Sequence, residues 1–395
     1  MTVGETTARA TALERAQAVR PVLEKYAAEV DATGEFPVAG VRALRDSGLL
    51  GLLVPARHGG LDGDVGDLVD IAQVLAGGCL STGLIWAMHC QQVDALVNHG
   101  SPALLDELLP RIAAGEVYLA SVTTEPRTGG HLLTAAAPLR EADGGLAFER
   151  WAPIVTGGEH ADGFLITLLA SEDSAENQVS LVYADRDRLR SQTHGGWDPL
   201  GMRGTRSVGM RLSGVVPAHH VVGEPGGFRT VATESMIVAG HLGWAACWLG
   251  AARAATSAVV ALLRSPRRPR GVDLRSDLMA ERLARIRMDL ELVGGYLHRV
   301  RDEVLAHRAA GRSVDNPSSQ IHLNTLKVTA AELTFRAVDR LMQLTGLATG
   351  YLKDSPVPLE RHFRDLRSAS LNYSNDRLLT ATGTLTLLDR AVRLA

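Results

Sequence analysis

One carboxylate, Glu234, stands where acid–base chemistry could take place. It precedes residues 236–252, which are apolar on every face, so this segment is expected to form a helix buried on all sides. If Glu234 points inward with Val231, Ile237 and Val238, the loss of hydration would suit it to accept a proton near neutral pH. If it points to solvent, it is an ordinary acid of a first helical turn.

A second group of residues could bind a ligand through hydroxyl and backbone N–H groups. The segment SVTTEPRTGG (121–130) leaves a strand through a turn that contains Pro and Gly, where the backbone can approach a ligand closely. Thr123, Thr124, Gly129 and Gly130 are the candidates in this turn. The alternative is that these residues only build the turn.

Histidine and cysteine give no sign of a metal centre. His89 and His99 lie in apolar helical sequence without a visible partner, which favours core or capping roles. Cys79, Cys90 and Cys247 lie in apolar contexts without metal-ligand spacing. We therefore expect reduced core thiols, a reducing compartment and no metal site.

Composition is that of an ordinary globular protein. The 395 residues are 46% hydrophobic and 22% charged, and the net charge of -3 provides no basic field for nucleic acid. The N-terminal residues contain no apolar signal region, and no segment is expected to cross a membrane. These features predict a cytoplasmic protein without nucleic-acid or membrane partners.

The hydrophobic periodicity changes twice along the chain. Residues 8–112 have helical spacing, residues 117–222 form short runs of period two or of continuous apolar character, and helical spacing returns from residue 228. An Arg- and Pro-rich loop at 264–277, either solvated or phosphate-binding, interrupts this last part. The pattern predicts an α+β protein of three domains: an N-terminal helical domain (1–116), a middle sandwich or barrel of about seven strands (117–227), and a C-terminal four-helix-like bundle (228–395).

Several motifs in this order resemble the acyl-CoA dehydrogenase superfamily over essentially the whole chain. SVTTEPRTGG is similar to the family's TEPxxGS turn, and ERHFRDLR (360–367) is similar to its ER..RD.R segment. The other matching segments are GLLGLLVPARHGG (48–60), RWAPIVTGGEHADGF (150–164), LGMRGTRS (200–207), VVPAHHVVGEPGGF (215–228) and MQLTGLATGY (342–351).

The resemblance implies a flavin cofactor, FAD or FMN. Thr156 would lie by the isoalloxazine ring, and Ile154 stands where the family has a flavin-stacking Trp. Gly130 replaces a Ser whose hydroxyl usually meets a phosphate. The implied cofactor-binding residues are Thr123, Thr124, Gly129, Gly130, Ile154 and Thr156, together with Gln343, Gly346 and Gly350, which would reach the diphosphate of a dimer mate.

The family's usual catalytic Glu is missing from this chain. It follows the RD.R segment in most members, where this chain has Tyr373 or Ser374. In isovaleryl- and long-chain-type members the Glu comes from the central helix, and TESMIVAG matches that pattern with Glu234 in register and Ser235 in place of Arg. The resemblance therefore implies that Glu234 is the base, and that Ser235, Tyr373 and Ser374 contact the substrate.

The implied reaction is α,β-dehydrogenation of an acyl thioester, carried by CoA or by a carrier protein. Glu234 would remove the α-proton, a hydride would pass to the flavin, and an electron acceptor would then take the electrons. The alternative is a two-component flavin monooxygenase that takes reduced flavin from a partner reductase; a non-catalytic relative is a third reading. The resemblance also implies a homotetramer or homodimer.

Overall fold

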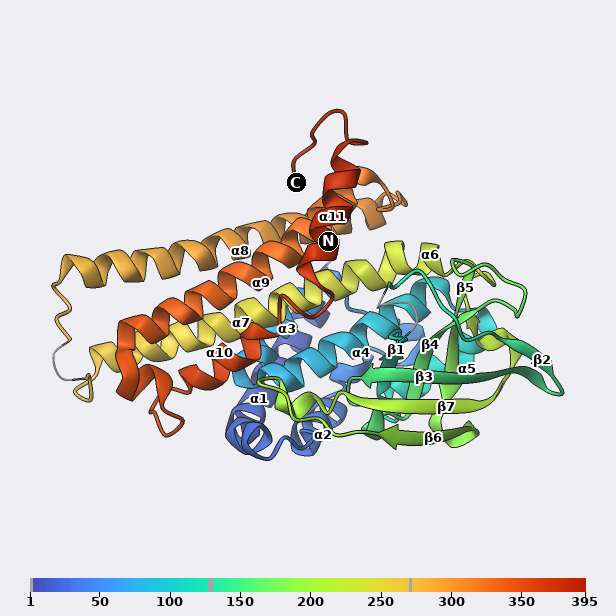
Figure 1. Cartoon of the computed structure of the whole chain (residues 1–395), viewed down its shortest axis with the longest axis horizontal. Helices are drawn as coiled ribbons and strands as arrows, with labels where there is room; N and C mark the ends of the chain where they lie inside the picture. The colour runs from blue at the N-terminus through green and yellow to red at the C-terminus, as the bar shows by residue number, and fades with distance from the viewer. Residues whose placement is uncertain (1–2, 127–130, 270–271) are drawn as a thin grey trace.

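The computed structural model describes residues 3–126, 131–269 and 272–395. Figure 1 shows the strands gathered at one end of the molecule and the long helices α7, α8 and α9 running side by side toward the other end. The N-terminal helices lie against both parts. Gly129 and Gly130 lie outside the described residues.

Five helices form the N-terminal part. A capping box starts α3: the Asp64 side chain accepts hydrogen bonds from the backbone N–H groups of Gly66 and Asp67, and the Asp67 side chain accepts one from the backbone N–H of Asp64. Ser101 caps α5 through the N–H of Leu104, as its position in the sequence predicts. The helices are α1 (Val3–Thr33), α2 (Val38–Asp46), α3 (Val65–Gly78), α4 (Leu80–His99) and α5 (Pro102–Ala113).

The strands form two four-stranded sheets. One sheet has the order β1-β4-β5-β8, with β1 parallel to β4, and the other has the antiparallel order β2-β3-β7-β6. Strands β4 and β5 are buried along their whole length, which explains their continuous apolar sequence. The strands are β1 (Leu119–Val122), β2 (Arg140–Ala142), β3 (Gly145–Val155), β4 (Gly163–Leu169), β5 (Val179–Asp185), β6 (Leu189–His194), β7 (Val208–Val216) and β8 (Val221–Val222).

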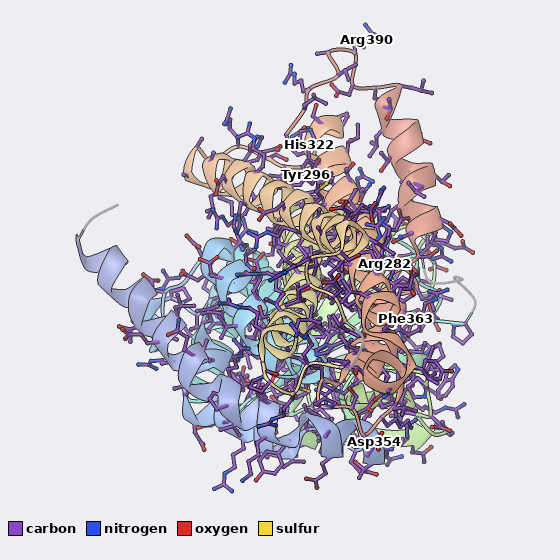
Figure 2. The ribbon with its side chains drawn as sticks, turned by 90° about the vertical axis from the view of Figure 1, so that its left-hand side faces the viewer. Arg282, Tyr296, His322, Asp354, Phe363 and Arg390 are labelled. Atoms are coloured by element: carbon purple, nitrogen blue, oxygen red, sulfur yellow. The ribbon has the colours of Figure 1, made fainter. Side chains whose placement is uncertain are left out.

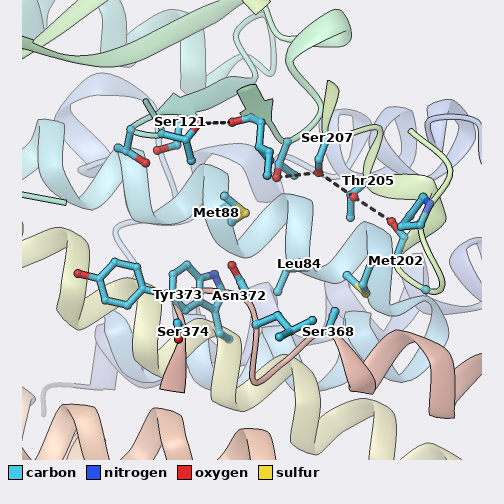
Figure 3. Close-up of a pocket in the computed structure, with 18 of the residues that line it drawn as sticks. Leu84, Met88, Ser121, Met202, Thr205, Ser207, Ser368, Asn372, Tyr373 and Ser374 are labelled. Atoms are coloured by element: carbon cyan, nitrogen blue, oxygen red, sulfur yellow. Dashed lines mark hydrogen bonds between the residues drawn. The ribbon is translucent and has the colours of Figure 1, made fainter. Parts of the chain in front are cut away.

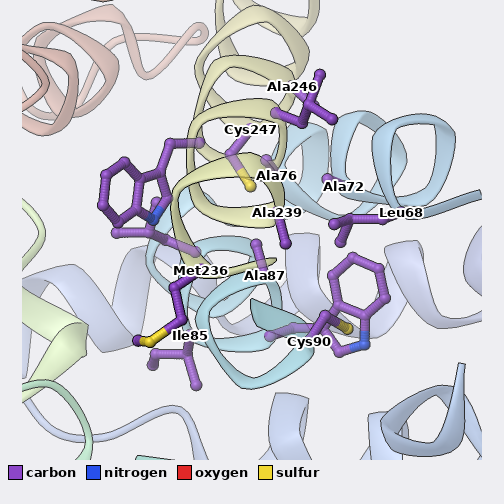
Figure 4. Packing of buried hydrophobic residues seen from close by; sticks show 14 of the residues in the cluster. Leu68, Ala72, Ala76, Ile85, Ala87, Cys90, Met236, Ala239, Ala246 and Cys247 are labelled. Atoms are coloured by element: carbon purple, nitrogen blue, oxygen red, sulfur yellow. The ribbon is translucent and has the colours of Figure 1, made fainter. Parts of the chain in front are cut away.

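The central helix runs from Phe228 to Arg264. It consists of α6 (Phe228–Val231), a π-helical turn (Ala232–Met236) and α7 (Ile237–Arg264). Its length and apolar composition would allow it to cross a membrane, but it packs against α3, α4, α8 and α9 and is the core helix of the molecule. In Figure 4, side chains of α3, α4 and α7 meet in this core, including Cys90 and Cys247, which are buried free thiols like Cys79.

The remaining helices complete the C-terminal part. Helix α9 (Pro317–Gly346) packs against α7, α8 (Asp277–Ala309), α10 (Leu359–Arg367) and α11 (Asn375–Thr386). Figure 2 views these helices from the side and shows Tyr296 and His322 below Arg390 of the C-terminal segment. The order of helical, sheet and helical parts confirms the predicted fold class.

Candidate functional site

A cavity of about 580 Å³ lies where the three parts of the chain meet. Strand ends from the sheets form one side, α4 contributes Leu84 and Met88, and the turn between α10 and α11 forms the opposite side with α7. Figure 3 shows these two sides facing each other across Met88. Several of the predicted site residues line this cavity: Thr123, Thr124, Ile154, Thr156, Tyr373 and Ser374.

Hydroxyl groups cover the side of the cavity that the sheets provide. The Oγ of Ser207 lies 3.0 Å from Thr156 Oγ1 and 2.9 Å from Thr205 Oγ1, and Thr205 also donates to the carbonyl of Met202 at 2.8 Å. Thr124 donates to the carbonyl of Ile154 at 2.8 Å. We call this surface the hydroxyl wall; its members are Ser121, Thr123, Thr124, Thr156, Thr205 and Ser207.

The backbone of β3 exposes Ile154 in the same wall. The pairing of β3 with β7 is irregular between Ala152 and Val155, a bulge that redirects the intervening side chains. Ile154 is 47% exposed although it is large and apolar. Gly157 then ends the strand at φ +61°, where a Cβ atom would lie 2.5 Å from the Tyr118 hydroxyl oxygen, so glycine is required.

A buried ion pair supports the hydroxyl wall from behind. Arg150 and Glu125 are 0% and 8% exposed and form a salt bridge. Glu125 accepts hydrogen bonds from the N–H groups of Ala136 and Ala137, and Arg150 donates to the carbonyl of Thr124 at 3.1 Å. Burial lowers the pKa of Arg150, while the neighbouring Glu125 carboxylate opposes that shift. The pair therefore fixes the turn that carries Thr124.

The opposite side of the cavity has apolar and aromatic side chains, and α10 and α11 also contribute Arg364, Arg367 and Arg377 to the lining. The rings of Trp244 and Tyr373 lie 6.3 Å apart, and Met236 contributes a thioether. Tyr373 has a φ of +53°, an uncommon value for a residue with a side chain. We call the surface formed by Met236, Trp244 and Tyr373 the aromatic wall.

Lys327 of α9 holds the turn that carries Tyr373. Its buried ammonium donates to the carbonyls of Ala369 and Tyr373, both at 3.0 Å, and to the side-chain oxygen of Asn375 at 2.8 Å. Burial lowers the pKa of Lys327 to about 7, against the opposing effect of Glu332.

Two buried donors on cavity-lining residues have no hydrogen-bond partner in the described part of the chain. They are the indole N–H of Trp244 and the side-chain amide nitrogen of Asn372. Buried polar groups without partners are rare, and an unpaired donor beside a cavity suits an acceptor atom of a ligand.

Glu234 lies in the π-helical turn and does not line the cavity. Its carboxylate accepts a hydrogen bond from the Ser313 hydroxyl and others from the N–H groups of Val314 and Asp315, at 3.2 and 3.4 Å. Met236 lines the cavity instead. The π-helical turn shifts the side-chain register that ordinary helical spacing assumes, which explains why Glu234 does not share the inward direction expected of it.

Ser235 points away from the cavity as well. Its hydroxyl lies 3.1 Å from Nε2 of His99, and the residue is fully buried. His89, the other histidine singled out in the sequence, is buried between Leu50 and Leu119, with its ring nitrogens 2.9 Å from the Leu50 carbonyl and 3.1 Å from the Leu119 N–H. Burial lowers the pKa of His89 to about 4.

Gln343, Gly346 and Gly350 lie at the end of α9, away from the residues that line the cavity. Gln343 is exposed and bonds only to Asp339 of its own helix among the contacts described. Gly346 has a φ of +71° and open space around it. Gln343 and Gly346 are exposed and Gly350 is buried, and none of the three lines the cavity of its own chain.

The cavity also contains residues that the motifs did not reveal. Gln91, Trp244, Asn372 and Ser207 all line it, and they come from four different parts of the chain. Ser207 stands in the segment LGMRGTRS and Trp244 in the apolar segment 236–252, but neither residue was itself a candidate for the site. Among the residues that the structure describes, no Asp, Glu or His lines the cavity.

The residues present fit a flavin. A flavin ring needs an apolar contact for its face and donors for its polar edge. Ile154 offers the apolar contact, and the Thr and Ser side chains of the hydroxyl wall offer the donors. Thr156 and Ser207 would hold the ring edge, and Ile154 would contact its face.

Comparisons with known proteins agree with this fit. Residues 7–116 match the model "Acyl-CoA dehydrogenase, N-terminal domain", and residues 242–374 match "Acyl-CoA dehydrogenase, C-terminal domain". The short-chain-specific acyl-CoA dehydrogenase of Clostridium acetobutylicum is 26% identical over 358 residues, which cover 88% of each chain.

Solved structures share the fold over almost the whole chain. Butyryl-CoA dehydrogenase from Megasphaera elsdenii has a TM-score of 0.83 and 20% identity, with 98% of this chain and 99% of that chain covered. The FMN-bound dibenzothiophene monooxygenase TdsC from Paenibacillus sp. A11-2 has a TM-score of 0.85 and 23% identity, with 96% and 98% covered. The chain thus belongs to the acyl-CoA dehydrogenase family and is a flavin-dependent oxidoreductase of that type.

Proposed function

We propose that this enzyme is a flavin-dependent monooxygenase, the alternative that the sequence left open. The observation that carries the proposal is the absence of any acidic or histidine side chain among the described residues that line the cavity. Removal of an α-proton from an acyl thioester requires a base within hydrogen-bond reach of that proton. The carboxylate of Glu234 is occupied by the loop between α8 and α9.

The chain's own residues would bind and orient the two reactants. The hydroxyl wall would hold the flavin, which supplies the oxygen-transfer chemistry once it is reduced and meets O₂. The aromatic wall would hold an apolar part of the substrate and exclude water. Overall, one atom of O₂ enters the substrate and the other leaves as water, while reduced flavin becomes oxidised. A separate flavin reductase supplies the electrons.

Dehydrogenation of an acyl thioester is the second candidate function. The curated relatives support it, since the one from Clostridium acetobutylicum is named an acyl-CoA dehydrogenase and matches over most of both chains. In addition, Glu234 stands only two positions before Met236, which lines the cavity. A change of register in the π-helical turn would be required to bring the carboxylate inward. Its substrate would be an acyl-CoA or a carrier-bound acyl group, and an electron acceptor would complete the reaction.

One experiment separates the two functions. The flavin-loaded protein is titrated without oxygen with short and branched acyl thioesters, on CoA and on a carrier protein, while the visible spectrum is recorded. We expect the flavin to stay oxidised. The flavin is then reduced by an added reductase, and isotope-labelled O₂ is admitted with candidate apolar substrates. We expect a product that carries one labelled oxygen atom.

The opposite result would favour the second candidate. Bleaching of the flavin band by a thioester, lost in Glu234→Gln, would establish a dehydrogenase with that base and overturn the monooxygenase proposal.

We also propose a cytoplasmic homodimer or homotetramer in which Gln343, Gly346 and Gly350 contact the cofactor of a second copy. That arrangement suits FAD, whose diphosphate extends farther than the single phosphate of FMN.

A further inference from the structure

Three potential metal ligands meet on the outer side of the β-sheets, among residues that do not line the flavin cavity. Glu107 comes from α5, and His219 and His220 come from the short helical turn Ala218–His220 that leads into β8. Nε2 of His219 lies 3.4 Å from Oε2 of Glu107, and Nε2 of His220 lies 3.3 Å from the same oxygen. The candidate ligand atoms of all three residues lie within 4.8 Å of one another.

These separations suit coordination better than hydrogen bonding. N–H···O bonds in proteins usually measure about 2.7–3.2 Å between heavy atoms. The ligand atoms of a tetrahedral zinc site, with bonds of about 2.0–2.1 Å, lie about 3.3–3.4 Å apart. Both histidines match that spacing with respect to one carboxylate oxygen.

The two neighbours of the His220 ring nitrogens also favour a metal ion over a hydrogen bond. Its Nδ1 lies 3.3 Å from the carbonyl oxygen of Tyr183, while its Nε2 faces the carboxylate of Glu107. Both partners accept hydrogen bonds, but a neutral imidazole has only one N–H. A metal ion on Nε2 would leave Nδ1–H for the carbonyl, the arrangement common for histidine ligands.

The cluster is accessible to an ion from solvent, and a neighbouring arginine partly neutralises the charge of Glu107. The side chains of His219 and Glu107 are 42% and 32% exposed, so an ion can enter and a water molecule can complete its coordination. Arg188 is a charged neighbour, and its guanidinium lies 4.0 Å from the other oxygen of Glu107. That contact would orient the carboxylate without occupying Oε2.

We propose that Glu107, His219 and His220 bind one divalent transition-metal ion, with Zn²⁺ the best match to two imidazoles and a carboxylate. The ion would link α5 to the start of β8 and so join the helical part to the sheets. The proposal departs from the sequence-based expectation of no metal site. It is independent of the flavin reaction, since none of its ligands lines the cavity.

The test uses the full-length, flavin-loaded protein after treatment with a chelator. Zn²⁺ is titrated against a competing chromophoric chelator, and the melting temperature is recorded with and without Zn²⁺. Co²⁺ serves as a spectroscopic substitute. We expect one Zn²⁺ per chain, a tetrahedral Co²⁺ spectrum, and a melting temperature raised by the metal, because the ion binds the folded state.

Variants assign the site. His219→Ala and Glu107→Gln should each weaken Zn²⁺ affinity about tenfold or more, by loss of a direct ligand. His298→Ala, at an exposed histidine of α8, should leave the affinity unchanged. Binding of Zn²⁺ that survives both ligand variants, or no binding by the unmodified protein, would overturn the proposal and leave the cluster as an ion pair. Flavin content should be equal in all variants, which keeps this result separate from the flavin function.

Discussion

At the scale of single residues, the unpaired indole N–H of Trp244 offers a donor to a ligand in the cavity. Trp244→Phe keeps an aromatic ring in the aromatic wall but removes this donor. A single hydrogen bond contributes about 0.5–1.5 kcal/mol, so we expect KM to rise roughly twofold to tenfold with kcat less affected. Steady-state kinetics would measure this. Trp151→Phe, outside the cavity, is the control; equal kinetics for both variants would contradict a binding role for the indole N–H.

Glu234 is the residue on which the two candidate functions differ most. Under the monooxygenase proposal, Glu234→Gln weakens the bonds from Ser313 and Val314, and we expect a loss of about 1–2 kcal/mol in unfolding free energy with the oxygenation rate retained. Urea unfolding and product formation would measure the two effects. Glu224→Gln, in the loop after β8, is the matched control. A full loss of turnover in the Glu234 variant alone would be inconsistent with the proposed role.

Sequence motifs identified some residues of the cavity, but they could not identify residues that reach it only through the packing of distant elements. Thr124, Ile154 and Thr156 stand in segments with a recognisable order of Pro, Gly and hydroxyl residues, and all three line the cavity. Trp244 and Asn372 reach it from separate helices and turns. The local sequence around them gives no information about what they face, because that depends on how the elements pack.

At the scale of elements, the turn between α10 and α11 depends on Lys327. Lys327→Met removes three hydrogen bonds to that turn, and Tyr373 would lose the contact that holds its uncommon backbone conformation. We expect a loss of about 2–4 kcal/mol of unfolding free energy and a higher KM. Urea unfolding and kinetics would test this, with Lys353→Met as an exposed control. If Lys327→Met has the stability and KM of the wild-type protein, Lys327 does not position the turn between α10 and α11.

The stability of the contact between α8 and α9 at His322 should depend on pH. His322 of α9 lies 2.7 Å from the Glu303 carboxylate of α8, and this hydrogen bond raises the pKa of His322. A raised pKa in the folded state stabilises the protein below the unfolded value of about 6.5, and that contribution is lost as the pH rises through the folded value. His322 also contacts the carbonyl of Arg393, so the C-terminal segment shares this stability.

We therefore expect the contribution of His322 to the free energy of unfolding to fall as the pH increases above about 6.5. His322→Gln should abolish that part of the pH dependence, while His298→Gln, on the exposed side of α8, should not. Urea unfolding at several pH values between about 5.5 and 8.5 would measure it. A parallel pH dependence in the wild-type protein and His322→Gln would contradict the role given to this pair.

Element boundaries followed from the sequence where burial imposes a clear period. Strands β4 and β5 are continuous apolar runs, and the long helices have repeating apolar faces. Strand β6 is mostly exposed and β8 has two residues, so neither forms the apolar or alternating run that predicts a strand. The π-helical turn at Ala232–Met236 was also not predictable, because its one-residue change of register leaves no mark in apolar spacing.

At the scale of the whole molecule, an apolar surface remains uncovered beside the end of α9. Leu347 and Tyr351 of the π-helical turn Leu347–Tyr351 are 71% and 66% exposed, and Leu352 follows them. Exposed apolar groups of this kind mark interaction surfaces, and Gln343 and Gly346 stand next to them. We propose that this surface contacts a second copy of the chain, which gives a homodimer or a homotetramer.

A single charged substitution at this surface should disrupt the oligomer. Leu347→Asp would place a carboxylate in an apolar interface, where its desolvation is costly, so we expect a smaller particle by size-exclusion chromatography with light scattering. Flavin should be lost with it, because the residues proposed to contact the cofactor of the second copy would separate from that cofactor. Val38→Asp, at an exposed apolar position on α2, should change neither property. An unchanged particle mass together with full flavin content in Leu347→Asp would show that the second copy binds elsewhere. A smaller particle that has also lost its flavin would show that the end of α9 is needed for both assembly and cofactor binding.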